Sequence, residues 1–300
     1  MDRSRGRITG LSGGLYTIRL DGGDVVNCRA RGVFRHEGVS PLVGDVVTVE
    51  HADGQAVVHS VEDRKNALIR PPLANLDIMF VGLAAAKPEP SEFTADKLIS
   101  ICEYNDITPV VLITKSELDG KRAEELEKIY RLAGYDVFVT SSVENTGIEA
   151  LKSYLKENLP GRIAAFSGVS GAGKSTLMNK LFPELSLETG EISKKISRGK
   201  NTTRQVTLYE VYGGYLADTP GFSMIDFERF DFFGKDDLAG TFREFSDCLG
   251  KCRYTDCTHL CEEGCAVIEK MNEGKIAPSR HESYKELYKI LKEKHDWDKK

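Results

Sequence analysis

The chain has no long hydrophobic segment. No apolar run in its 300 residues approaches the roughly 18 positions that a membrane-spanning helix requires. The first seven residues, MDRSRGR, lead into no apolar stretch of the kind that secretory signal peptides contain. We therefore expect a cytoplasmic protein with no membrane span, and we expect it to be a monomer.

An excess of positive charge is also missing. The 46 acidic residues outnumber the 41 Lys and Arg, which gives a net charge of −5. This balance excludes a uniformly basic coat for nucleic acid, although it allows local basic patches. The length is enough for two or three globular domains.

Cysteines are scarce outside one segment. Cys28 and Cys102 stand alone, whereas five of the seven cysteines lie between residues 248 and 265. In a chain with no secretory signal, this crowding favours a metal site over disulfides. The segment supplies thiols and an imidazole, which tetrahedral structural zinc prefers. Reduced buried cysteines are the alternative, but the charged neighbours would make a poor core, and the region after about residue 230 is too small to be stable by apolar burial alone.

A complete phosphate-binding motif occupies residues 168–175. The sequence GVSGAGKS fits G-x-x-x-x-G-K-[ST], with a buried strand predicted over 163–166 and a helix over 176–182. Backbone N–H groups and the helix dipole favour phosphate there, Lys174 would reach the β- and γ-phosphates, and Ser175 would ligate Mg²⁺. A glycine-serine turn before an unrelated helix is the alternative. The predicted nucleotide contacts are Gly168, Val169, Ser170, Gly171, Ala172, Gly173, Lys174, Ser175 and Thr176.

A second triphosphate-sensing motif, D-x-x-G, begins at Asp218 and ends at Gly221. Asp218 would hold Mg²⁺ through water, and the Gly221 N–H would meet the γ-phosphate. Thr202 or Thr203, in the preceding polar segment, could close over Mg²⁺ and the γ-phosphate; we assign Thr203. The basic residues there fit either a mobile switch or a solvated loop: Lys194, Lys195, Arg198, Lys200 and Arg204.

The N-K-x-D element of guanine-binding proteins is absent after Gly221. Upstream, however, a predicted strand over 109–113 ends in TKSE (114–117). A predicted helix (121–133) and a strand (137–140) follow, and the strand ends in two serines. This is the order of a base-binding half placed before the phosphate-binding half, although TKSE alone would indicate only a surface loop. The candidate base contacts are Thr114, Lys115, Glu117, Ser141 and Ser142.

Taken together, these motifs resemble the circularly permuted GTPases of the RsgA/YjeQ family. The resemblance extends over essentially the whole chain and includes VGDVVTVE (43–50), RKNALIRPPLANLD (64–77), RGKNTTR (198–204) and DTPGF (218–222). It implies a multidomain protein: an all-β OB-fold over 1–62, a permuted α/β P-loop GTPase domain over 63–228 and a mainly helical zinc module over 229–300.

The resemblance also implies partners and ligands. Family members act in maturation of the small ribosomal subunit, and the subunit with its rRNA stimulates their hydrolysis of GTP to GDP. The pattern C-x₄-C-x-H-x₅-C implies one structural zinc ion, and GTP implies Mg²⁺. The zinc ligands would be Cys252, Cys257, His259 and Cys265, which leaves Cys248 and Cys261 outside the pattern.

The two ends of the chain carry patterns of their own. Short alternating runs within residues 1–62 predict a small barrel. Arg29, Arg31 and Arg35, with Phe34 among them, would contact RNA or solvate a barrel edge. Near the C-terminus, Tyr284, Leu287, Tyr288 and Leu291 predict the packed face of a helix. The opposite lysines would meet RNA or serve solubility: Lys285, Lys289 and Lys292.

The chain departs from the family at several site positions. Thr114 replaces an Asn whose amide ties neighbouring loops together, and losing such bonds costs on the order of 1.5–3 kcal/mol. Glu117 keeps two acceptors for guanine but is longer than Asp. Asn201 stands where the family has His, and Phe222 cannot orient water. We therefore expect slow intrinsic hydrolysis that the ribosome or Gln205 completes. Two rivals stay open: an RNA-binding module with vestigial hydrolysis, and a P-loop enzyme of relaxed nucleotide specificity.

Overall fold

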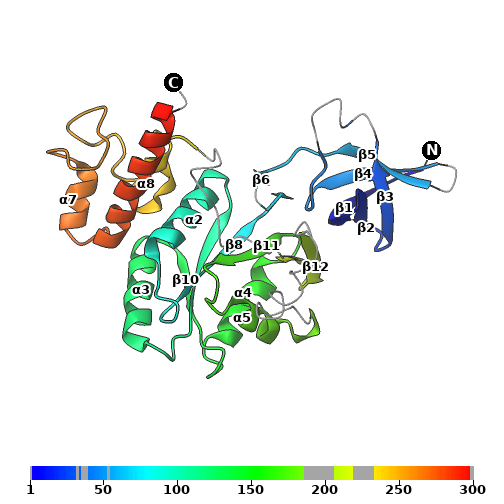
Figure 1. Ribbon diagram of the computed structural model, residues 1–300, viewed down its shortest axis with the longest axis horizontal. Coiled ribbons are helices and arrows are strands. Elements are labelled where there is room, and N and C mark those ends of the chain that lie inside the picture. The colour runs from blue at the N-terminus through cyan, green and yellow to red at the C-terminus, as the bar shows by residue number, and fades with distance from the viewer. Residues whose placement is uncertain are drawn as a thin grey trace. The chain divides into compact units, whose positions relative to one another are not determined.

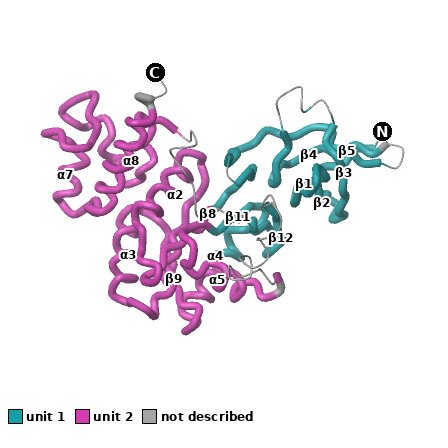
Figure 2. Tube along the Cα trace, in the orientation of Figure 1, with its two compact units in different colours: residues 1–78, 154–166, 194–222 teal, residues 79–153, 167–193, 223–300 magenta. Residues whose placement is uncertain are grey.

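The structure is a computed structural model that describes residues 2–31, 34, 40–52, 55–69, 71–185, 206–218 and 233–297 (Figure 1). The chain divides into two compact units (Figure 2). The first comprises residues 1–78, 154–166 and 194–222, and the second comprises 79–153, 167–193 and 223–300. Within the described residues, no helix combines the length and the apolar character needed to cross a membrane.

A five-stranded barrel begins the first unit. Its strands are β1 (Asp2–Ser12), β2 (Leu15–Leu20), β3 (Val25–Ala30), β4 (Val46–Ala52) and β5 (Gln55–Val61). Strand β1 pairs with both β2 and β4, which closes the barrel. Alternate side chains such as Ile8, Ile18 and Val47 point inward and are fully buried. The predicted N-terminal barrel is confirmed.

Three further strands of the first unit continue from the barrel. They are β11 (Ile163–Gly168), β12 (Thr207–Val211) and β13 (Gly214–Asp218). Strand β13 runs parallel to β11 and antiparallel to β12, and β12 pairs with barrel strand β1 at Gly10 and Thr207. Two short strands, β6 (Ala67–Leu68) and β7 (Leu73–Ala74), form a separate small sheet in the connection after the barrel.

The second unit contains the strands and helices of the predicted base-binding half. They are β8 (Ile78–Ala84), α2 (Glu92–Tyr104), β9 (Thr108–Thr114), α3 (Gly120–Leu132) and β10 (Asp136–Val139). Strands β9 and β10 are parallel. Ser91 and Asp119 cap α2 and α3 by accepting backbone N–H groups of the first turn. The strand–helix–strand order predicted upstream of the phosphate-binding motif is confirmed, with ends shifted by one residue. Two further helices are α4 (Ile148–Asn158) and α5 (Lys174–Leu181), which a 3₁₀ turn η1 (Pro183–Leu185) follows.

The C-terminal module, residues 233–297, is mainly helical as predicted. It contains 3₁₀ turns η2 (Leu238–Thr241) and η3 (Arg243–Phe245) and helices α7 (Ala266–Asn272) and α8 (Pro278–Trp297). The predicted apolar face of α8 is buried: Tyr284, Leu287, Tyr288 and Leu291 are at most 8% exposed. Phe242 and Phe245 complete this core, with ring centroids 5.3 and 5.0 Å from that of Tyr284.

A buried arginine joins the module to the base-binding half. Arg280 of α8 is 1% exposed and donates to Asp96 of α2 at 2.6 Å and to Glu244 at 2.7 and 3.1 Å. Its guanidinium also lies over the rings of Phe242 and Tyr135, at 4.6 and 5.5 Å. Burial raises the pKa of Asp96, and the charge of Arg280 opposes this rise.

We predict that Arg280→Met destabilises the protein by about 3–5 kcal/mol, because it leaves the carboxylates of Asp96 and Glu244 buried without their charged partner. Denaturant unfolding would measure the loss. Lys285→Met on the same helix is the matched control, since Lys285 pairs only with the exposed Glu282. Equal unfolding curves for the two variants would contradict this prediction.

Candidate functional site

The phosphate-binding loop connects β11 to α5, as its sequence predicts. Gly168 ends the strand with φ 129°, and a Cβ there would lie 2.2 Å from the carbonyl oxygen of Gly82 on β8. Only glycine therefore fits this close approach. Gly173, with φ 81°, precedes the first helical residue, Lys174. The first turn of α5 thus points its free N–H groups toward the loop, and Ser175 and Thr176 belong to this turn.

Lys174 folds back over the loop. Its Nζ donates to the carbonyl oxygens of Gly168 and Val169, at 2.7 and 2.8 Å. Burial lowers the pKa of this amine to about 8, and among the described residues no carboxylate pairs with it. A desolvated ammonium with only neutral acceptors creates a strong local preference for an anion.

Thr114 joins the predicted base-binding loop, 114–117, to the phosphate-binding loop. Its hydroxyl lies 2.5 Å from the carbonyl oxygen of Ala172 and 3.2 Å from that of Leu83. Thr114 is only 4% exposed, so this bond has little competition from water. Thr114 thus joins the two loops through its hydroxyl. That it lacks the amide which Asn would offer to the base stays a prediction.

Lys115 and Glu117 follow on the same loop. The stem of Lys115 passes beside Gly173, where its Cε lies 3.6 Å from the position of a Cβ. Its Nζ donates to the carbonyl oxygen of Lys87, which lies in the loop after β8. No sequence motif predicted that this loop would lie beside the phosphate-binding loop. Pro88 of that loop approaches Gly171. Glu117 Oε2 is buried and has no hydrogen-bond partner among the described residues, so the carboxylate can accept a further donor.

The second predicted base-contacting loop follows β10. Ser141 is fully buried, its N–H donates to the carbonyl oxygen of Thr146 at 3.0 Å, and its hydroxyl accepts the N–H of Glu144 at 3.0 Å. These bonds fold the loop into a tight turn. Ser142, the next residue, is partly exposed. Of these two serines, Ser142 is therefore the one whose side chain is accessible at the surface of the loop.

The switch residues are only partly covered by the structure. Asp218 is the last residue of β13. The remaining predicted switch and RNA positions lie outside the described residues: Thr202, Thr203, Gly221, Asn201, Gln205, Phe222, Arg35 and the basic residues of 194–204.

The four predicted metal ligands come together. Their ligand atoms all lie within 4.8 Å of one another. His259 Nδ1 is 3.4 Å from Cys252 Sγ and 3.5 Å from Cys265 Sγ, and the two sulfurs are 4.0 Å apart. Zn–S bonds of about 2.3 Å in a tetrahedron place sulfurs about 3.7 Å apart. Three thiols, one imidazole and this spacing fit a structural zinc ion.

Groups around the cluster hold the ligand loop in place. The carbonyl oxygen of His259 contacts His281 Nε2 at 2.7 Å, and Tyr284 donates to the carbonyl oxygen of Thr258 at 2.8 Å. Glu262 accepts N–H groups of residues 258, 260 and 261. Burial opposes ionisation of Glu262, but the hydrogen bond from the Thr258 hydroxyl, together with the backbone N–H groups, outweighs it and lowers its pKa to about 2. Cys248 is buried outside the cluster and Cys261 is exposed.

The barrel residues suggested for RNA contact differ among themselves. Arg29 is exposed on β3. Arg31 donates to the buried Glu50 at 2.5 Å. Phe34 is 7% exposed, so it packs in the interior and is not available to stack on a base. The prediction that Phe34 lies among RNA-contacting residues is therefore wrong.

Comparison with known proteins gives consistent results. The RsgA GTPase family model matches residues 61–228, and the RsgA N-terminal domain model matches residues 5–58. The small ribosomal subunit biogenesis GTPase RsgA of Caldanaerobacter subterraneus subsp. tengcongensis is 40% identical over 297 residues, covering 98% of both chains. The protein of the same name from Bacillus velezensis is 38% identical over 293 residues, covering 96% of this chain and 97% of that protein.

Solved structures agree with this result. The crystal structure of YjeQ from Thermotoga maritima has a TM-score of 0.81 and 33% identity, covering 97% of this chain and 99% of that chain. YloQ, described as a circularly permuted GTPase, has a TM-score of 0.79 and 30% identity, covering 97% and 96%. With its base-binding elements ahead of the phosphate-binding loop, this protein is a circularly permuted P-loop GTPase. The chain belongs to the RsgA GTPase family.

Proposed function

We propose that this protein is a GTPase that binds the small ribosomal subunit and acts in its late maturation. The observation that carries the proposal is the hydrogen bond from Thr114 to Ala172, which joins the base-binding loop to the phosphate-binding loop. Upstream and downstream motifs thus contribute to one nucleotide site. The two relatives named small ribosomal subunit biogenesis GTPase RsgA support the ribosomal part of the proposal.

The residues take distinct roles in this proposal. Glu117 accepts the N–H groups of guanine and Lys115 lies along the base, while Thr114 positions the loop and Ser141 and Ser142 border the base. Residues 168–176 wrap the phosphates. Lys174 leaves its two carbonyl acceptors and pairs with the β- and γ-phosphates, where it stabilises the charge that spreads during attack by water. Thr203 and Gly221 complete the γ-phosphate site.

The donor sets fit two different metal ions. Mg²⁺ bound with GTP supplies positive charge to the β- and γ-phosphates, and the hydroxyls and carboxylate that would hold it are those of Ser175, Thr203 and Asp218. Zn²⁺ would be held by Cys252, Cys257, His259 and Cys265, where it stabilises the fold of the C-terminal module.

We further propose a division of labour along the chain. Residues 1–62 contact rRNA as an OB-fold, residues 63–228 bind and hydrolyse GTP, and residues 229–300 form a zinc module whose exposed lysines on α8 face the subunit. The protein works in the cytoplasm as a monomer.

Single-turnover hydrolysis of GTP and of ATP, with and without purified small subunits, tests the proposal. We expect stimulation by the subunit that is confined to GTP. Nucleotide-dependent subunit binding without stimulation would instead indicate an RNA-binding module with vestigial hydrolysis. Equal use of ATP would indicate a P-loop enzyme of relaxed specificity.

The hydroxyl of Thr114 allows a direct test of the joined loops. Thr114→Val keeps the shape of the side chain but leaves the carbonyl oxygen of Ala172 without this bond, at a cost of about 1–3 kcal/mol. We expect the affinity for GDP to fall by about 5- to 150-fold in calorimetric titration. Thr241→Val removes an equally buried hydroxyl in the C-terminal module and should leave GDP affinity unchanged. Unchanged affinity in Thr114→Val would show that the bond does not support nucleotide binding.

A further inference from the structure

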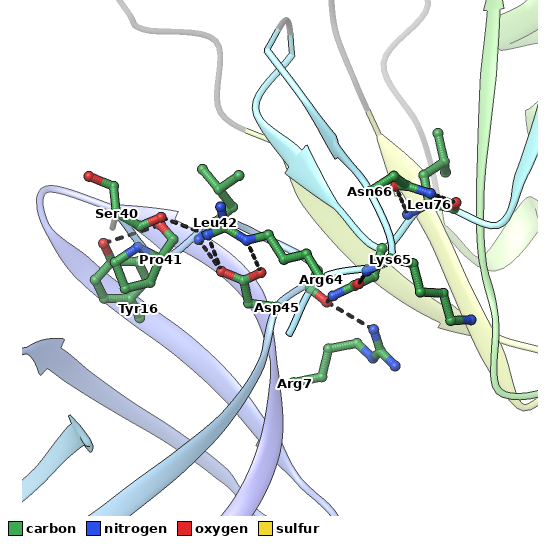
Figure 3. A network of polar contacts seen from close by, with 12 residues as sticks. Arg7, Tyr16, Ser40, Pro41, Leu42, Asp45, Arg64, Lys65, Asn66 and Leu76 are labelled. Carbon is green, nitrogen blue, oxygen red and sulfur yellow. Dashed lines mark hydrogen bonds and ion pairs between the residues drawn. The ribbon is translucent and has the colours of Figure 1, made fainter. Parts of the chain in front are cut away.

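Two motifs of the sequence have no role in the nucleotide site, and the structure brings them together. VGD (43–45) forms the turn that enters β4, and RKN (64–66) begins the connection after the barrel. Figure 3 shows Asp45 of the first motif facing Arg64 of the second. Asp45 is fully buried and accepts Arg64 at 2.7 and 2.8 Å and the N–H of Leu42 at 2.7 Å. We call residues 42–45, 64–66 and 74–77 the barrel junction.

The backbone of the junction is packed too tightly for a side chain at Gly44. Its φ is 94°, and a Cβ would lie 2.1 Å from the carbonyl oxygen of Ala74. The carbonyl oxygen of Gly44 accepts both Arg7 Nη1 at 2.9 Å and Asn75 Nδ2 at 3.2 Å. Because the carbonyl has two bonds and the backbones touch, this turn has little freedom to move against the connection.

The junction continues without a break into β11. Asn66 and the backbone of Leu76 exchange two hydrogen bonds, of 2.9 and 3.0 Å (Figure 3). Asp77 then pairs with Ile163, the first residue of β11, through its N–H and its carboxylate, both at 2.9 Å. Lys65 adds an ion pair to Asp77 at 2.9 Å.

Three contacts join the barrel directly to the β12–β13 hairpin. Arg7 of β1 lies over the ring of Tyr215 on β13, 5.5 Å from its centroid. Arg19 of β2 pairs with Glu210 on β12 at 2.9 Å. The backbone pairing of β1 with β12 lies beside them. Arg7 is therefore bonded to the junction turn and packed on β13 at the same time.

The β12–β13 hairpin lies between the two predicted switch motifs in the sequence. Strand β12 begins at Thr207, directly after RGKNTTR and Gln205–Val206 in the sequence, and β13 ends at Asp218, the first residue of DTPG. Barrel, junction, β11 and hairpin belong to one compact unit (Figure 2). Hydrogen bonds and packing contacts therefore connect the barrel with the strand that ends at Asp218.

We propose that Arg7, Asp45 and Arg64 are positioning residues that couple engagement of the barrel by RNA to the placement of Asp218. The inference rests on the proposed function, because Asp218 acts there through Mg²⁺. It deepens that function by naming the path through which the subunit stimulates hydrolysis: from the barrel turn at 42–45, through Arg7, to β13.

Asp45→Asn and Arg7→Met test the path. Asp45→Asn keeps the side-chain shape and leaves no unpaired buried charge, because Arg64 is 24% exposed and can be hydrated. Arg7→Met keeps the apolar stem but loses the donors and the charge. Arg5→Gln is the matched control, since Arg5 lies two residues from Arg7 on β1 and, within the described part of the chain, forms its ion pairs with exposed acids, Asp21 and Glu62. Subunit affinity is measured with a non-hydrolysable GTP analogue, and single-turnover hydrolysis with and without saturating subunits.

We expect both junction variants to bind subunits as the wild type does, while the ratio of the stimulated to the unstimulated rate of hydrolysis falls by at least about tenfold, or about 1.4 kcal/mol. The double variant Asp45→Asn/Arg7→Met should lose no more of the stimulation than either single variant, because both substitutions act on one path. Wild-type stimulation in both variants would overturn the inference. So would a fall in the stimulated rate that weaker binding of the subunit alone accounts for.

Hydrogen exchange without subunits separates this inference from the proposed function. In Asp45→Asn, amides of 214–218 should exchange faster while those of β2 and β3 stay protected. Wild-type exchange at 214–218 would show that the junction does not reach β13, and the inference would fail. If exchange accelerates but the wild-type enzyme is never stimulated by subunits, the proposed function fails and the mechanical path stands.

Discussion

Lys174→Ala is expected to abolish measurable GTP hydrolysis, with a fall of at least about 10²–10³ in the single-turnover rate. The amine is desolvated and, among the residues that the structure describes, bonded only to the carbonyl oxygens of Gly168 and Val169. A phosphate offers it full negative charge in place of two neutral acceptors, so the loss of the amine removes a charge-assisted contact that strengthens as the γ-phosphoryl group departs.

The same substitution should weaken binding less than it slows hydrolysis. A charge-assisted hydrogen bond contributes about 1.5–3 kcal/mol, which corresponds to about a 10- to 150-fold change in affinity for GTP. The backbone N–H groups of the loop and of the first turn of α5 stay in place. Calorimetric titration and single-turnover hydrolysis under saturating GTP measure the two effects separately.

An exposed lysine on α3 provides the matched control. Lys128→Ala removes an amine from the solvent-facing side of the helix and should change neither quantity. Normal hydrolysis in Lys174→Ala would mean that the backbone amides alone stabilise the phosphates, and the proposed role of Lys174 would be wrong.

Cys257→Ser is expected to remove the metal and to unfold the ligand loop of the C-terminal module. Metal binding contributes about 10–16 kcal/mol in structural zinc peptides, and loss of one thiolate should weaken it by more than about 100-fold. Few apolar side chains of residues 248–265 are buried, so nothing replaces the metal in holding this loop. Elemental analysis should find one zinc ion per wild-type chain and none in the variant.

Trypsin measures the structural consequence. Lys251 and Arg253 lie in the loop, so cleavage after them should become fast in Cys257→Ser, and a strong chelator should have the same effect on the wild type. Cys261→Ser is the matched control, because Cys261 is exposed and lies outside the cluster. Equal cleavage of both variants, or zinc retained in Cys257→Ser, would refute the assignment.

Local patterns predicted much of the fold. The strand over 163–166 and the helix after it follow from an apolar run and a glycine-rich motif that only a strand–loop–helix can satisfy. The four metal ligands also lie within 14 residues of each other, so their spacing in sequence nearly determines their spacing in space. The packed face of α8 follows from its helical period.

Contacts between distant segments could not be predicted in this way. Arg280 and Asp96 are 184 positions apart, and each alone looks like a solvated helix charge. Pairing of β1 with β12 depends on which strand edges are left open once both sheets exist. Thr114 shows a further limit: its hydrogen bond to the carbonyl oxygen of Ala172 joins positions 58 residues apart, and no local pattern indicates it.

The pairing of Arg280 with Asp96 also sets an order of events during synthesis. The base-binding half leaves the ribosome first, but burial of the Asp96 carboxylate without its partner is costly. At about 5–20 residues per second, the 184 intervening residues take roughly 10–40 s to be made. During that time the Asp96 carboxylate of α2 has no charged partner, and the emergence of α8 supplies it. Nascent chains stalled before residue 280 should therefore be far more sensitive to protease than chains released a few residues past it.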